Sequence, residues 1–207
     1  EVIQNMGIPT LSRITPPTLG WDKQFYNTFG EYNPEKAKSL IKESGYDGTP
    51  LVMHSSTSWL MQKEVAEIVA TMLESVGLKI DLRVMDVTTF REQVYYPYKN
   101  QDIYMDALGN SFFDPWIAVL SFRSDRRERT GWNDSYADQA DKLIRSAAVN
   151  MNPANRAAEY IKLQHLVNDN GPMVPLYQMK DAIGVNKKLK WDMPLDGFLW
   201  FGDATIY

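Results

Sequence analysis

The chain has 207 residues, and none of them is cysteine. Disulfide frameworks, thiolate zinc sites and cysteine nucleophiles are therefore excluded, and the absence suits a protein of an oxidising, extracytoplasmic compartment. Only two histidines are present, His54 and His165, and no HExxH or similar spacing surrounds them. A zinc site would need several carboxylates, so we predict structural roles for both histidines. His54 keeps a ligand contact as an alternative role, because it lies near the end of a predicted strand.

Long apolar runs and a basic face are missing as well. No stretch approaches the ~20 apolar residues that a membrane helix needs. Residues 1–20 lack the basic and apolar regions of a secretion signal, and the chain begins without Met, so we expect the native start to lie upstream. The net charge is -4, and acids interrupt the densest run of arginines, at 123–129. Nucleic-acid binding requires a basic face, so we expect no nucleic-acid partner.

The sequence motifs of common enzymes are not found either. There is no G-x-S-x-G around a serine and no G-x-x-x-x-G-K-[ST] phosphate loop. The serines at 55–58 lie next to His54, but a Ser/Thr-rich loop after a strand is typical of a helix cap. A hydrolase with paired carboxylates would have only Asp106 and Asp114 nearby in the sequence. We therefore predict no catalytic residue, no metal and no cofactor.

Helix and strand patterns alternate in the first half of the chain. Leu78, Ile80 and Leu82 alternate with polar residues and so indicate a half-buried strand, whereas apolar residues recur at helical spacing before Gly77. Such alternation favours right-handed crossovers over a mostly parallel sheet, and we predict an α/β fold. The predicted elements are helix 34–44, strand 50–56, helix 59–76, strand 78–85, helix 87–95 and strand 102–109.

The second half has a different character. Helical patterns cover 115–122, 135–149 and 153–169, and the segments 172–178 and 181–186 resemble a pair of neighbouring strands. Residues 1–33 show no period and are expected to arrive as a connection from another domain. Residues 191–207 are rich in aromatic side chains without helical spacing, so these side chains either fill a core or form a surface that something else covers.

Five segments, in this order, carry a family resemblance over about residues 7–190. They are YNPEKAKSLIKESGYDG (32–48), VAEIVATMLESVGLKIDL (65–82), Asp114-Pro115, GWNDSYADQADKLI (131–144) and NRAAEYIKLQHLVNDNGPMVPLYQ (155–178). Together they resemble the family 5 extracytoplasmic solute-binding proteins, the receptors of peptide, oligopeptide and nickel importers of the ABC type. All five belong to the C-terminal half of that family's longer chains.

The resemblance implies a lobe like those of type II periplasmic binding proteins, with a mixed, mostly parallel sheet flanked by helices. It divides the chain into an incoming crossover (1–33), a C-terminal ligand-binding lobe (34–190) and a segment (191–207) that returns toward an N-terminal lobe outside this sequence. Trp200 and Phe201 should then be exposed. The resemblance also implies a periplasmic or cell-surface location, with secretion and a lipid anchor encoded elsewhere in the protein.

The implied function is non-covalent capture of a small solute between two lobes, followed by delivery to an ABC permease in the membrane. An oligopeptide is the default ligand of the family. An oligosaccharide or another non-peptide solute is the alternative within the family. A carboxylate-based glycoside hydrolase and a sensory lobe are the alternatives outside it.

Three places are expected to line the ligand cleft. The loop at 55–59 follows a strand and opens a helix, whose first amides suit an anion, while Trp59 either stacks on a ligand or packs on the helix. Gly131-Trp132-Asn133 offers a ring and an amide, with burial of Trp132 under the next helix as the alternative. The third place is the loop at 109–115. The predicted ligand-binding residues are Ser55, Ser58, Trp59, Asn110, Ser111, Phe112, Asp114, Trp132 and Asn133.

The loop at 109–115 departs from the family in one respect. In the peptide-binding members, an aspartate four residues before the matching proline grips the α-amino group of the peptide. That position is Ser111 here, and a hydroxyl cannot supply the charge-assisted bond that an ammonium group prefers. Asp114 matches the family's structural acid before proline, with ligand contact as its alternative. The resemblance therefore leaves peptide and non-peptide ligands open.

Overall fold

The computed structural model describes residues 5–28, 30–95, 102–110 and 112–207. The chain divides into two compact units. Unit 1 comprises Glu1–Asn5 and Gly30–Ala107, and unit 2 comprises Met6–Phe29 and Leu108–Tyr207. Unit 1 is thus inserted into the chain of unit 2. Each unit has its own hydrophobic core.

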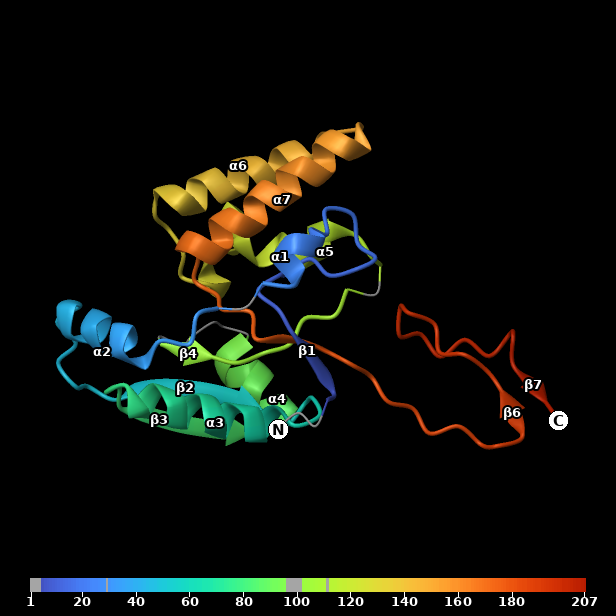
Figure 1. The fold of residues 1–207 in the computed structure, drawn as a ribbon, viewed down its shortest axis with the longest axis horizontal. Coiled ribbons are helices and arrows are strands. Elements are labelled where there is room, and N and C mark those ends of the chain that lie inside the picture. The colour runs from blue at the N-terminus through green and yellow to red at the C-terminus, as the bar shows by residue number, and fades with distance from the viewer. Residues whose placement is uncertain (1–4, 29, 96–101, 111) are drawn as a thin grey trace. The chain divides into compact units, whose positions relative to one another are not determined.

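Unit 1 is built on a parallel sheet of three strands in the order β3-β2-β4 (Figure 1). The central strand β2 (Leu51–Ser56) pairs with β3 (Ile80–Met85) along its whole length and with β4 (Ile103–Tyr104) at two positions. Helix α3 (Gln62–Ser75) connects β2 to β3 and packs on the sheet, where Met53 meets the small side chains of the helix. The predicted α/β class with a parallel sheet is confirmed.

Helix α2 (Pro34–Glu43) begins where the sequence predicts it. The side-chain oxygen of Asn33 accepts a hydrogen bond from the backbone N–H of Lys36 at 2.9 Å, and proline stands at the first helical position. A capped start of this kind depends only on neighbouring residues, and the prediction of a helix over 34–44 is confirmed.

Helix α3 begins three residues later than predicted, at Gln62 instead of Trp59. Met61 has a positive φ of 61°, which lies in the left-handed region and cannot continue a right-handed helix. Residues 57–61 therefore form a turn. The late start leaves Ser58 and Trp59 in a loop at the end of the central strand.

The remaining elements of unit 1 are short. Helix α4 (Val87–Phe90) is capped by Asp86 and continues as a π-helical turn at Arg91–Tyr95, so the helix predicted over 87–95 is confirmed in a less regular form. Strand β4 covers only two residues of the strand predicted over 102–109. The sheet partner β2 determines how far the strand extends, and the sequence pattern alone does not show this.

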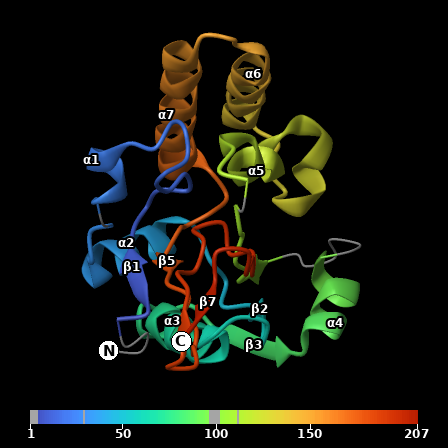
Figure 2. The ribbon, with the colours of Figure 1, turned by 90° about the vertical axis from the view of Figure 1, so that its right-hand side faces the viewer.

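Unit 2 is mainly helical. Helices α6 (Ser135–Val149) and α7 (Pro153–Asn170) lie side by side in both views (Figures 1 and 2). Their apolar stripes, which include Tyr160 of α7, meet in a core that also receives Ile14 and Trp132. The smaller helices are α1 (Lys23–Tyr26), α5 (Pro115–Val119) and the 3-10 turns at Leu120–Phe122 and Ser124–Arg129.

The segment from residue 10 to residue 21 packs closely against α7, although it contains no helix or strand. The side-chain oxygen of Gln164 accepts hydrogen bonds from Ser12 Oγ at 2.6 Å and from the N–H of Ile14 at 3.1 Å. Its side-chain nitrogen donates to the carbonyl of Gly20 at 2.9 Å. These bonds satisfy polar backbone groups inside the core, which irregular chain requires when it is buried.

The strand pair predicted from 172–178 and 181–186 is wrong. Strand β5 (Tyr177–Met179) pairs antiparallel with β1 (Gly7–Pro9), and residues 181–186 contain no strand. The strand predicted over 172–178 overlaps β5 only at its end. The partner of β5 is β1, from the opposite end of the chain. Sequence neighbours are the simplest choice of partner, and tertiary packing overrides that choice here.

The last segment forms an open hairpin of β6 (Leu189–Lys190) and β7 (Thr205–Ile206). Trp191 Nε1 donates to the carbonyl of Trp200 at 2.7 Å, and its ring lies 5.0 Å from that of Phe201. Trp200 is nevertheless 67% exposed and Phe201 55% exposed, so the predicted exposure of these rings is confirmed. None of the helices in the described ranges is long and apolar enough to span a bilayer.

Candidate functional site

In unit 1 the candidate site lies at the carboxyl end of β2, the edge at which parallel sheets bind ligands. Ser58 is exposed there. Trp59 is 41% exposed, so packing within the protein leaves a large part of this residue open to solvent. The hydroxyl of Ser58 lies 2.7 Å from the hydroxyl of Ser56, which is buried. This part of the loop presents one hydroxyl and one aromatic face to solvent.

Ser55 requires a correction. The side chain is fully buried, and its Oγ has no hydrogen-bond partner among the described residues. Side chains two residues apart point to the same face of a strand, so Ser55 follows Met53 onto the face that packs against α3. A solute cannot reach it in this conformation, and the predicted ligand contact of Ser55 is not supported.

Gln62 is a residue of this site that the sequence prediction missed. It is buried and contacts both the serine loop and the chain beyond β4. A signal was present, because Gln62 stands three residues before Val65 and four before Ala66, on the buried face of α3. A polar residue on such a face needs hydrogen-bond partners, and the loop provides them.

In unit 2 the candidate site is the loop before α5. Asn110 is half-buried and donates from Nδ2 to Thr18 Oγ1 at 3.3 Å, whereas the ring of Phe112 is 73% exposed. Phe113 has a positive φ of 50°, an unusual value for a bulky residue. Ser111 lies outside the described residues, so its ligand contact stays a prediction.

Asp114 caps helix α5 and forms an ion pair. Its Oδ1 accepts from the N–H of Trp116 at 2.8 Å, and Nη2 of Arg156 lies 3.2 Å and 3.3 Å from the two carboxylate oxygens. The residue therefore has the structural role that the family resemblance implies. With two partners already bound, its carboxylate is poorly placed to take an ammonium group from a ligand.

Arg156 and Tyr160 occupy successive turns of α7 and influence each other. Burial works to lower the pKa of Arg156, but Tyr160 and Asp114 beside it outweigh this effect and raise the pKa above its usual value. Burial raises the pKa of Tyr160, and the nearby guanidinium opposes that shift in part. Arg156 is thus a fixed positive charge that Asp114 neutralises.

A hollow of about 440 Å³ opens beside this ion pair. Its size is within the range of small-molecule sites. The walls combine two aromatic rings with the paired charges of Asp114 and Arg156. The lining residues, all in unit 2, are Phe112, Asp114, Trp116, Ile117, Ala148 and Arg156.

Trp132 is a second correction. Its side chain is only 6% exposed and packs edge-on against Phe122, with 6.0 Å between ring centroids. The ring belongs to the core beneath α6 and α7, which is the alternative role given for it above, so the predicted ligand contact is not supported. Asn133 beside it is exposed, and its contact stays a prediction.

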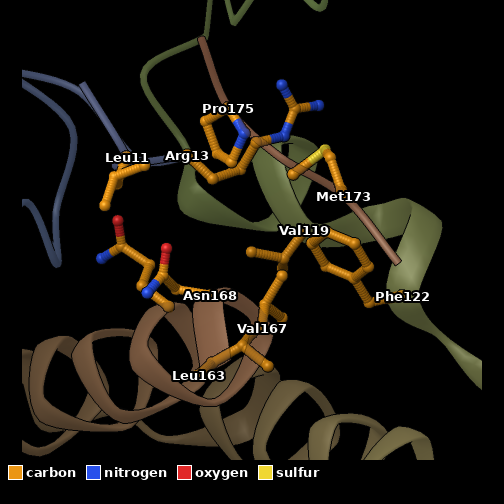
Figure 3. Close-up of a pocket in the computed structure, with 10 residues that line it drawn as sticks. Leu11, Arg13, Val119, Phe122, Leu163, Val167, Asn168, Met173 and Pro175 are labelled. Atoms are coloured by element: carbon orange, nitrogen blue, oxygen red, sulfur yellow. The ribbon is translucent and has the colours of Figure 1, made fainter. Parts of the chain in front are cut away.

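A small void in the core of unit 2 has no room for a solute (Figure 3). Its volume is about 10 Å³, which is at the lower limit for one water molecule. Val119, Phe122 and Leu163 give it mostly apolar walls, so it is a small gap in the core.

Metal binding has no support in the described part of the chain, where no group of three or more potential ligands occurs. His165 Nε2 lies 3.7 Å from Asp22 Oδ2, and its ring packs 4.4 Å from that of Phe25. This is the structural role predicted for His165. In unit 1, the carbonyl of His54 accepts from the N–H of Met105 at 2.8 Å, next to the end of β4.

Sequence and structure comparisons identify the family. Residues 1–129 match the family described as bacterial extracellular solute-binding proteins, family 5 Middle. The chain belongs to this family. The glutathione-binding protein GsiB of Escherichia coli K12, a curated relative, is 25% identical over 202 residues. That alignment covers 93% of this chain and 39% of GsiB, so the chain spans about two fifths of its relative's length.

Solved structures agree with the family assignment at the level of the fold. HbpA2 from Haemophilus parasuis superposes with a TM-score of 0.76 at 18% identity, covering 99% of this chain and 41% of HbpA2. The Escherichia coli murein tripeptide binding protein MppA gives 0.75 at 20% identity, with 92% and 38% covered. The fold of this family 5 chain is that of a periplasmic-binding-protein lobe.

Proposed function

We propose that this chain is part of the substrate-binding component of an ABC importer. The family match over residues 1–129 carries the proposal. The proposed ligand contacts of this chain are Ser58 and Trp59 within unit 1 and, taken separately, Asn110, Ser111 and Phe112 within unit 2. A solute would be captured without covalent chemistry and passed to a membrane permease.

A peptide is the ligand class that the relatives favour. GsiB is named for glutathione, and MppA is named for a murein tripeptide. Two features of this chain favour peptide-like compounds without a free amine, or oligosaccharides, as the alternative. Ser111 replaces the family's aspartate, and Asp114 is engaged by Arg156 and by the start of α5.

We also propose that the protein is not an enzyme. A carboxylate-based hydrolase would need a protonated acid next to a free carboxylate. Asp114 does not fit this pattern, because Arg156 and the N–H of Trp116 already bind its carboxylate oxygens. A sensory lobe would share the fold, and no feature of the described residues favours it over a transport receptor.

The chain covers only 39% of GsiB, and this supports a further lobe as a partner in the complete protein. An N-terminal lobe encoded outside residues 1–207 would provide the opposite wall of the cleft, and residues 191–207 would return to it. The complete protein would be periplasmic or held at the cell surface, with a lipid anchor as one means of attachment.

Calorimetric titration of the complete protein tests the ligand class. Glutathione, a pool of free oligopeptides, the same pool after N-acetylation, and cello- and manno-oligosaccharides form separate arms. Peptide or glutathione binding would support the default assignment. Heat from the sugar arms alone would overturn the peptide assignment, and heat from none of the arms would contradict binding of these solute classes.

Trp59→Ala locates the site within unit 1. Loss of a stacking ring should raise the Kd by about tenfold. Tyr32→Ala serves as the matched control, because Tyr32 is a more exposed aromatic residue of the same unit, outside the candidate loops. Equal Kd values for Trp59→Ala and the unaltered protein would remove Trp59 from the site.

A further inference from the structure

Buried Gln62 links the end of β2 to the chain beyond β4, which is distant in sequence. Its Oε1 accepts a hydrogen bond from Ser56 Oγ at 3.0 Å, at the end of β2. The same oxygen accepts from the backbone N–H of Trp59 at 3.3 Å, in the loop. Its Nε2 donates to the carbonyl of Met105 at 3.1 Å, just beyond β4.

These contacts use the side-chain amide in a way that few other residues could reproduce. Gln62 is 5% exposed, so water cannot readily replace a lost partner. The amide supplies an acceptor on one side and a donor on the other, and here both are used. A leucine of similar size would leave the N–H of Trp59 and the carbonyl of Met105 without these partners, at a cost in stability.

The local backbone depends on the same contacts. Helix α3 starts at Gln62 without a side-chain cap, after Met61 in the left-handed region. A non-glycine residue in that region persists only when its surroundings hold it there. The bonds to Gln62 come from Ser56, just before the turn at 57–61, and from Trp59 within it, so they tie the turn to the start of α3.

We propose that Gln62 is a positioning residue for solute recognition, holding Ser58 and Trp59 in the conformation that contacts the ligand. The proposal rests on the function proposed above, because it presumes that this loop is part of the ligand site. Gln62 itself does not touch the solute. It acts through the backbone N–H of Trp59 and through Ser56, whose hydroxyl lies against that of Ser58.

Hydrogen exchange on the complete protein without solute tests the first half of the proposal. In Gln62→Leu, the amides of residues 57–60 should exchange about tenfold faster than in the unaltered protein, as expected for the loss of one or two hydrogen bonds. In Gln62→Glu, an acceptor for Trp59 remains and the donor to Met105 is lost. Protection of the Trp59 amide should therefore return at least in part.

Gln164→Leu is the matched control. Gln164 is the corresponding buried glutamine of unit 2, also with three hydrogen bonds, and none of its partners belongs to the loop at 57–60. This variant should lower the thermal stability while leaving exchange at 57–60 unchanged. Unchanged exchange in Gln62→Leu, or equal loss of Trp59 protection in Gln62→Leu and Gln62→Glu, would overturn the proposal.

Solute affinity tests the second half. With the ligand class identified by the titration above, Gln62→Leu should raise the Kd by about tenfold, and Gln62→Glu should raise it less. Faster loop exchange with an unchanged Kd would overturn the role in recognition. If the unaltered protein binds no solute in any arm, the proposed function fails and the recognition role fails with it, while the exchange data still decide whether Gln62 holds the loop.

Discussion

Asp141 illustrates how one carboxylate of unit 2 stabilises the fold. Its Oδ1 accepts from the N–H of Ser124 at 2.9 Å, and its Oδ2 accepts from Nε of Arg145 at 2.7 Å. Burial would raise the pKa of Asp141, but the bonds from Arg145 and Ser124 outweigh it and hold the pKa below its usual value. The ionised form is therefore the one that stabilises the native state.

The sign of the pH effect follows from that depressed pKa. The stabilisation is present above the ordinary value of 3.8 and is lost as the pH falls through the lower pKa of the folded state. Asp141→Asn should therefore cost about 1 kcal/mol at neutral pH and progressively less in acid, as urea unfolding measured across the pH range would show. Asp203→Asn, at an exposed position, is the control. A difference that stays constant down to the lowest pH would contradict this account.

Individual residues were predictable from the sequence where their roles depend on near neighbours. The cap at Asn33 and the proline beside it follow from a local pattern, and Asp114 follows from its family motif. Ser55 and Trp132 were not predictable in this way. Their burial depends on α3 and on Phe122, and no pattern within a few residues shows which face of a strand or loop a distant element will cover.

At the scale of elements, Gly20 shows how closely the irregular segment approaches α7. Its φ is +80°, and a Cβ at this position would lie 2.8 Å from the Cβ of Tyr160. Gly45, after α2, has a similar φ of +73°, but nothing lies within 4 Å of its Cβ position. Both positions share the positive φ, but only Gly20 has a close neighbour, so comparing them distinguishes the cost of backbone conformation from that of steric overlap.

Substitution by alanine should have different effects at the two sites. Gly45→Ala carries only the conformational cost, about 1 kcal/mol. Gly20→Ala adds an overlap inside the core and should cost about 2–4 kcal/mol in total. Chemical denaturation of both variants measures the difference, and equal losses would show that the segment does not pack on α7 as described.

Elements with strong periodicity were the most predictable part of the fold. Helices α6 and α7 and strand β3 match their predicted ranges to within a few residues. The partner of β5 was mispredicted because strand pairing links residues 7–9 to residues 177–179. The start of α3 was mispredicted because Met61 adopts a conformation that its residue type does not favour.

At the scale of the whole molecule, the C-terminal segment at 191–207 exposes many apolar side chains. Its exposed apolar residues, among those described, include Leu195, Phe198, Leu199, Trp200, Phe201, Ile206 and Tyr207. Apolar side chains exposed in such number within one segment often contact another part of the protein. The N-terminal lobe proposed above would supply that contact.

Quenching of tryptophan fluorescence in the complete protein tests this contact. If the proposed lobe covers residues 191–207, Trp200→Phe should remove an emission component that acrylamide quenches slowly. The reason is that a covered indole is shielded from the quencher, although the ring is 67% exposed in this chain by itself. A removed component that is quenched as fast as free tryptophan would show that the segment stays in contact with water.

The order of the two units along the chain has a consequence for protein synthesis. Strand β1 is synthesised before most of unit 1, but its partner β5 follows some 170 residues later. Domains generally fold as they are synthesised. Unit 1, which ends at Ala107, can therefore form its sheet before the packing partners of residues 6–29 have been synthesised. Completion of unit 2 then depends on the last third of the chain, and we expect nascent chains arrested before α7 to expose residues 10–21 to protease.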